Sequence, residues 1–310
     1  MSAARYSVIQ HTIRGQHDGP RLLITGGVHG DEFEPIAAIR RLIEFFNTKQ
    51  QADLHGQVTL VPIVNEAAFL RGHRFADDGL DLARTCPGRA DGTVTEQTAF
   101  ALSQLIRDAD YYIDLHTGGT EFSVHPLAGY MLHENSTVLE LQRRMAGAFN
   151  LPIVWGTCGK LDGRSLSIAR DANVPAIYCE YLGGATSSPA GVAAYVDGCL
   201  NVMHELDMLT RDRPAYRVQY NVEDARPSSG HLQVRHPSPV DGYFEPSVGL
   251  GDRVNNGASI GTVFGLEPGH AHRVHSENSG IVIVLRTFPR VRAGESVGAV
   301  LDLTPTDSNS

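Results

Sequence analysis

The chain has 310 residues, of which 42% are hydrophobic and 20% are charged, and its formal net charge is −9 at pH 7. These values fit an ordinary globular protein, and the acidity argues against a nucleic-acid-binding protein. The sequence has no transmembrane-length apolar run, no secretion signal at the N-terminus and no C-x-x-C spacing among its four cysteines. We therefore expect a cytoplasmic protein with reduced thiols and no membrane partner.

Short apolar runs alternate with helical patterns from residue 21 to about residue 209. Strands are predicted at 21–28, 57–64, 111–115, 128–132, 152–154 and 176–180, with a further one at 6–13. Helices are predicted at 34–46, 95–107, 137–149, 166–173 and 189–209. Such alternation predicts an α/β fold with a mostly parallel, helix-covered sheet, in which sites form beyond the carboxyl ends of strands.

The segment from Asn65 to Gly92 shows no convincing periodicity and is rich in charged residues and glycine. Long loops inside compact domains are usually functional or disordered. We therefore expect a substrate-binding loop here.

The composition changes near residue 211, which predicts one domain over residues 1–211 and a second over residues 212–310. A polar linker to about Gly230 leads into a small all-β domain rich in glycine, valine, proline and turn signals. Its pattern R-V-x-x-G-x-S-[IV]-G-x-V occurs at 253–263 and again at 290–300. Two such units resemble the halves of a biotinyl/lipoyl-type β-sandwich. The turn between them, 264–279, lacks the lysine that such domains modify, so we expect a structural or gating role.

A candidate metal site begins in Gly26-Gly27-Val28-His29-Gly30-Asp31-Glu32, between the first long strand and the first helix. His29 and Glu32 are three residues apart at a helix start, so their side chains can point to one spot. His116, which follows the strand at 111–115, is the third candidate ligand. Two histidines and one glutamate with an open fourth position are typical of a catalytic zinc site.

Two carboxylates accompany these residues. Asp114 faces the same side of its strand as His116, where it would either orient a ligand histidine or cap a turn. Glu180 ends the apolar strand 176–180, where a carboxylate is costly without a partner or a task. It is the candidate acid and base, with a structural ion pair as the alternative.

The motifs at 26–32, 81–88, 114–118 and 177–180, taken in order, resemble the succinylglutamate desuccinylase/aspartoacylase family, a branch of the zinc carboxypeptidase clan. The resemblance covers about residues 20–209. It implies hydrolysis of the amide bond of a small N-acylated amino acid or amine. It also implies one zinc ion per chain, held by His29, Glu32 and His116, with Glu180 as general base and acid.

The resemblance further assigns roles to arginines, for which the alternative is a surface charge on a loop. Arg74 matches the family arginine that polarises the scissile carbonyl, and Arg84 matches the one that clamps the substrate carboxylate. Arg164 is a looser match to another substrate-binding arginine, and Asn65 is a further substrate-binding candidate. The asparagine that the family carries before its second arginine is Ala83 here, so one hydrogen bond to that carboxylate should be missing.

Two other functions remain open from the sequence. A metallocarboxypeptidase would need a pocket wide enough for a peptide chain. A non-catalytic ligand sensor would have kept the metal site without turnover. The expected partner is a small N-acyl substrate, and assembly into a homo-oligomer is left open.

Overall fold

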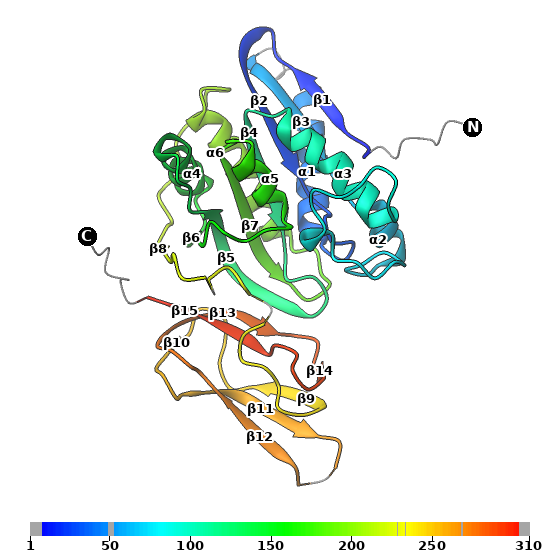
Figure 1. Ribbon diagram of the computed structural model, residues 1–310. Helices are drawn as coiled ribbons and strands as arrows, with labels where there is room; N and C mark the ends of the chain where they lie inside the picture. Colours follow the sequence, from blue (N-terminus) through cyan, green and yellow to red (C-terminus); the bar gives the residue numbers. More distant parts are fainter. Residues whose placement is uncertain (1–7, 49–52, 228, 233, 268, 304–310) are drawn as a thin grey trace.

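Figure 1 shows the computed structural model, in which the described residues are 8–48, 53–227, 229–232, 234–267 and 269–303. The larger of two sheets follows the order β1-β3-β2-β4-β7-β5-β13-β10. In addition, β6 pairs with β5, β8 pairs with β6, and β15 pairs with β13. Its first eight strands are β1 (His11–Arg14), β2 (His17–Thr25), β3 (His55–Val61), β4 (Tyr111–His116), β5 (Phe122–Met131), β6 (Ile153–Thr157), β7 (Ala176–Gly183) and β8 (Tyr220–Glu223).

Most pairs among these eight strands are parallel, with antiparallel pairing only between β1 and β3 and between β5 and β7. Helices cover both faces of this sheet (Figure 1). The helices of the chain are α1 (Phe33–Asn47), α2 (Glu66–Arg71), α3 (Val94–Arg107), α4 (Ser136–Phe149), α5 (Ser165–Asp171) and α6 (Pro189–Glu205), and all but α2 contribute to the two cores on these faces. The predicted α/β fold with a mostly parallel, helix-covered sheet is confirmed.

The two faces of the sheet have separate cores. Ile113 of β4 and Cys179 of β7 belong to the core that contains buried residues of α1, α4 and α6. Tyr112 of β4 and Ala176 of β7 belong to the core that contains buried residues of α3 and α5. Because side chains alternate along a strand, Asp114, His116 and Glu180 project on the same side as the second core.

Three segments differ from the sequence prediction. The segment expected to be a loop at 65–92 contains α2 and a 3₁₀-helix at Leu82–Arg84. The expected polar linker contains β8, which extends the large sheet beside β6. Of the strand predicted at 6–13, residues 6 and 7 lie outside the described residues, and the observed strand begins at His11. These strands form through distant pairings that local periodicity does not show.

The C-terminal β domain is present as predicted and lies below strands β1 to β8 in Figure 1. Its smaller sheet follows the order β12-β11-β9-β14, and β10, β13 and β15 join the larger sheet. The strands are β9 (Gly242–Pro246), β10 (Arg253–Val254), β11 (Ser259–Gly265), β12 (Ala271–His275), β13 (Gly280–Arg286), β14 (Arg290–Val291) and β15 (Gly298–Asp302). Each copy of the sequence repeat folds as a short strand, a turn and a longer strand, namely β10–β11 and β14–β15.

β13 connects the two parts of the molecule, because it pairs antiparallel with β5 as well as with β10 and β15. Among the described residues, every helix falls short of the length and apolarity that a membrane span requires.

Candidate metal centre

The turn between β2 and α1 carries two of the predicted ligands. β2 ends at Thr25, and Gly27 turns the chain with a φ of 60°, a conformation that favours glycine. His29 follows in the turn, and Glu32 is the N-cap residue of α1. His116 is the last residue of β4, which lies directly beside β2. The parallel register therefore delivers His116 to the same edge of the sheet.

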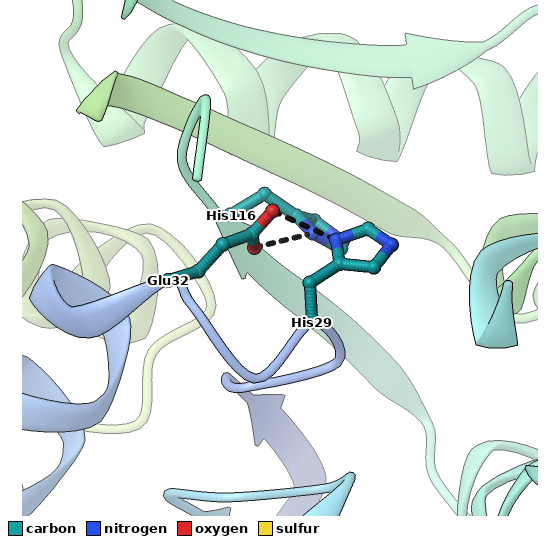
Figure 2. Close-up of side chains that lie close together, drawn as sticks. All are labelled: His29, Glu32 and His116. Carbon is teal, nitrogen blue, oxygen red and sulfur yellow. Dashed lines mark hydrogen bonds and ion pairs between the residues drawn. The ribbon is translucent and has the colours of Figure 1, made fainter. Parts of the chain in front are cut away.

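Figure 2 shows that these three side chains converge. His29 Nδ1 lies 2.7 Å from Glu32 Oε1, and His116 Nδ1 lies 3.1 Å from Glu32 Oε2. One ligand atom from each of the three residues lies within 4.8 Å of the others. Glu32 is 1% exposed and His29 is 3% exposed, so the carboxylate faces the imidazoles without competing water.

Two further carboxylates hold the outer nitrogens of the imidazoles. His29 Nε2 lies 3.1 Å from Asp81 Oδ1, and His116 Nε2 lies 3.1 Å from Asp114 Oδ2. Asp114 is itself held by hydrogen bonds from the hydroxyls of Thr25 and Ser165. Backing of this kind fixes the ring orientation and leaves each Nδ1 for a metal ion. Asp114 therefore lies where the orienting role requires it.

The contact between Asp81 and His29 was not predicted from the sequence. Asp81 is the first residue of the motif at 81–88, which carried the resemblance, and this was the only signal for it. Its other oxygen accepts a hydrogen bond from Arg74 Nη2 at 3.0 Å. Asp81 thus links a candidate metal ligand to a candidate catalytic arginine.

The electrostatics of the cluster match a buried cation. Burial would raise the pKa of Glu32, but His29 and His116 lower it to about 2. Burial lowers the pKa of His116, yet the stronger combined influence of Asp114 and Glu32 raises it well above its ordinary value. Without a metal ion, a proton on His116 therefore balances the buried carboxylates. Two imidazole nitrogens and one carboxylate with carboxylate backing fit zinc.

Zinc binding is expected to release at least one proton per chain near pH 7, because His116 must be neutral to coordinate a metal. The raised pKa of His116 sets the sign: zinc affinity falls as the pH falls, since protons then compete more strongly for the imidazole. Calorimetric titration in two buffers of different ionisation enthalpy measures the released protons. Equal observed heats in the two buffers would contradict this expectation.

Replacing Asp81 with asparagine is expected to weaken zinc binding by about 10- to 100-fold, the usual effect of losing a carboxylate behind a ligand histidine. Competition with a chelator of known affinity measures the change. Asp110→Asn is the matched control, because this carboxylate pairs with Arg21 away from the cluster. A D81N protein that binds zinc as tightly as this control would refute the backing role.

Glu180 lies beside the cluster, and its pKa is shifted in the opposite direction from that of Glu32. Its Cα pairs in parallel register with that of His116, and the residue belongs to β7. Its Oε2 is buried and has no hydrogen-bond partner among the described residues. Burial raises the pKa of Glu180 to about 8, and the attraction of His116 opposes this shift. An unpaired buried carboxylate is costly, so a structural ion pair does not explain it.

A pocket opens over the cluster and receives the three predicted arginines. Arg74 Nη1 lies 3.9 Å from Glu32 Oε1 at the metal end of the pocket. The guanidiniums of Arg84 and Arg164 donate hydrogen bonds only to backbone oxygens and form no ion pair with a described carboxylate. Burial and the charge of Arg84 lower the pKa of Arg164 to about 10. Two neighbouring guanidiniums without a carboxylate favour an anionic ligand.

The predicted substrate-binding residue Asn65 is absent from the pocket lining. It is fully buried, its Oδ1 caps α2 by accepting from the Ala68 N–H, and its Nδ2 has no hydrogen-bond partner among the described residues. Gly230 and Leu232, from the segment that leads into the β domain, line the pocket. Sequence reasoning missed them because neither side chain carries a chemical signal.

The mixed sheet, the His–Glu–His cluster and its arginine-lined pocket define a zinc-carboxypeptidase-like α/β protein. Residues 18–205 match the model of the succinylglutamate desuccinylase/aspartoacylase catalytic domain, and the chain belongs to this family, as the sequence motifs predicted. It is 30% identical over 311 residues to the N-alpha-acetyl-L-2,4-diaminobutyric acid deacetylase of Halomonas elongata, covering 96% of this chain and 86% of that relative.

Solved structures show the same fold. The product-bound ectoine utilization protein EutE (DoeB) from Ruegeria pomeroyi is similar with a TM-score of 0.85 and 27% identity, covering 94% of this chain and 88% of that one. A succinylglutamate desuccinylase/aspartoacylase from Rhodobacter sphaeroides has a TM-score of 0.83 and 24% identity over the same shares. The similarity extends over the C-terminal β domain, because nearly the whole chain is covered.

Proposed function

We propose that this protein is a zinc-dependent deacylase that hydrolyses the amide bond of a small N-acylated amino acid. The observation that carries the proposal is the position of Glu180 beside the His29–Glu32–His116 cluster, with its Oε2 buried and without a hydrogen-bond partner among the described residues. The family membership and the similarity to an N-alpha-acetyl-L-2,4-diaminobutyric acid deacetylase support a deacylase. One zinc ion per chain would be held by the three clustered residues.

Bound zinc would supply a Lewis acid that polarises the amide carbonyl and makes water more acidic. Glu180 accepts the proton of the attacking water, because its carboxylate has no other partner in the described residues. Burial makes this carboxylate a stronger base than an exposed glutamate. Glu180 then donates the proton to the departing nitrogen, so one residue serves as base and acid.

The arginines bind and polarise the substrate in this account. Arg74 is held by Asp81 and reaches toward Glu32, so it can donate to the carbonyl oxygen as negative charge develops there. Arg84 and Arg164 bind the substrate carboxylate, since neither has a carboxylate partner among the described residues.

The test is a hydrolysis assay on N-acetyl-L-2,4-diaminobutyrate, N-acetyl-L-aspartate, N-succinyl-L-glutamate and a dipeptide, with zinc-loaded and chelated protein. We expect release of a free amine from at least one N-acyl amino acid, loss of this activity on chelation, and its return with zinc. Hydrolysis of the dipeptide alone would support a carboxypeptidase. Tight binding of an N-acyl amino acid without turnover would support a sensor.

A further inference from the structure

Tyr178 faces the same pocket as Glu180. The two residues are two positions apart on β7, so their side chains project from one face of the strand. Cys179, between them, belongs to the core on the opposite face. At about 3.3 Å per residue, Tyr178 is offset from Glu180 by roughly 7 Å along the strand. This offset is comparable to the length of a small N-acyl amino acid.

Strand β5 makes room for the Tyr178 ring. Gly129 is the register partner of Tyr178, and a Cβ atom at residue 129 would lie 2.2 Å from Cε1 and 2.6 Å from the hydroxyl oxygen of Tyr178. Only glycine permits the ring to cross the backbone at this distance. The ring therefore lies across β5, and Met131 of the same strand also lines the pocket.

The Tyr178 hydroxyl has no hydrogen-bond partner among the described residues, although it lines a pocket rich in charge. Burial and the negative charge of Glu180 raise its pKa, so the group is a neutral O–H donor. Arg164 is the cation that acts on it most strongly, and Arg84 is in turn a neighbour of Arg164. An unused donor and two unpaired guanidiniums thus share one part of the pocket.

Ala83 has no polar side chain that could contact a ligand in this part of the pocket. It lines the pocket and, like Tyr178, packs against the same apolar cluster. Its backbone N–H already donates a hydrogen bond to Asp81 Oδ1 at 2.9 Å. A donor for the ligand must therefore come from another residue.

We infer that the Tyr178 hydroxyl donates a hydrogen bond to the substrate carboxylate beside Arg84 and Arg164. Tyr178 then selects N-acyl amino acids over N-acyl amines that lack the carboxylate. The inference rests on the proposed function, because it assumes that the scissile amide lies at the metal end of this pocket.

The test compares two probes with the same amide and the same amine. N-acetyl-L-2,4-diaminobutyrate has the carboxylate, and N-acetyl-1,3-diaminopropane lacks it. Their dissociation constants are measured by calorimetry with zinc-loaded Glu180→Gln protein, with and without Tyr178→Phe. Loss of a hydrogen bond to a charged group should weaken binding of the first probe by about tenfold or more. Binding of the second should change by less than about twofold.

Tyr181→Phe is the matched control, since Tyr181 belongs to the same strand but packs against Tyr195 in the opposite core. It should leave both dissociation constants unchanged. The inference would be overturned if Tyr178→Phe weakened binding of both probes equally or changed neither. It would also be overturned if the first probe failed to bind the parent protein, or if the Y178F protein lost zinc or unfolded. Since binding is measured without turnover, a wild-type protein that binds but never hydrolyses the first probe contradicts only the proposed function.

Discussion

Replacing Glu180 with glutamine is expected to leave zinc bound and to lower kcat by about 10²- to 10⁴-fold, the usual contribution of a general acid–base residue. Glutamine keeps the shape of the side chain but cannot accept a proton. The metal ligands are His29, Glu32 and His116 in our proposal, so zinc content should not change. Steady-state kinetics and metal analysis of the same protein preparation measure both quantities.

Glu223→Gln is the matched control for this substitution. Glu223 lies on β8 and is not among the residues that line the pocket. It forms an ion pair with Arg143 and accepts a hydrogen bond from the Tyr130 hydroxyl. The Glu223→Gln substitution should lower the free energy of unfolding while leaving kcat within about twofold of wild type. An E180Q protein that turns over as fast as E223Q would remove Glu180 from the mechanism. A loss of zinc in E180Q would instead make Glu180 a metal ligand.

Replacing His116 with alanine is expected to abolish both zinc binding and turnover. The variant keeps only two of the three converging ligand atoms and leaves the buried carboxylates of Glu32 and Asp114 without their shared partner. Zinc at 100 times its dissociation constant should stabilise wild-type protein by about 2.7 kcal/mol through mass action. The variant should show no such stabilisation in a thermal unfolding experiment.

His272→Ala controls for the loss of an imidazole in the same chain. His272 lies on β12 in the small sheet of the β domain and is not part of the cluster. It should keep the full thermal shift with zinc and the full rate of hydrolysis. If H116A retained the zinc-dependent thermal shift, the ion would be bound elsewhere in the chain.

The convergence of His29, Glu32 and His116 could be predicted because β2 and β4 end at one edge of a mostly parallel sheet. β2, β4 and β7 are neighbours in register, so His29, His116 and Glu180 had to reach one edge once the strands were recognised. The i, i+3 spacing then placed Glu32 beside His29. Local pattern and global topology agreed, which is why the geometry follows the prediction closely.

Other parts of the site depend on contacts that no local pattern encodes. Asp81 reaches His29 across 52 positions of sequence, and its segment showed no periodicity in which to place it. Gly230 lines the pocket, and its backbone oxygen accepts a hydrogen bond from the Arg164 guanidinium. The sequence does not show such a contact, because every residue has a backbone oxygen. The substrate-binding role of Asn65 stays a prediction, and its side-chain oxygen caps the start of α2.

Zinc stoichiometry measured together with deacylation tests the central claim most directly. Protein purified without chelator should hold about one zinc ion per chain, lose both zinc and hydrolysis of N-acyl amino acids during dialysis against a chelator, and regain both when zinc is added. Zinc-free protein that hydrolyses these amides at the full rate would contradict the account.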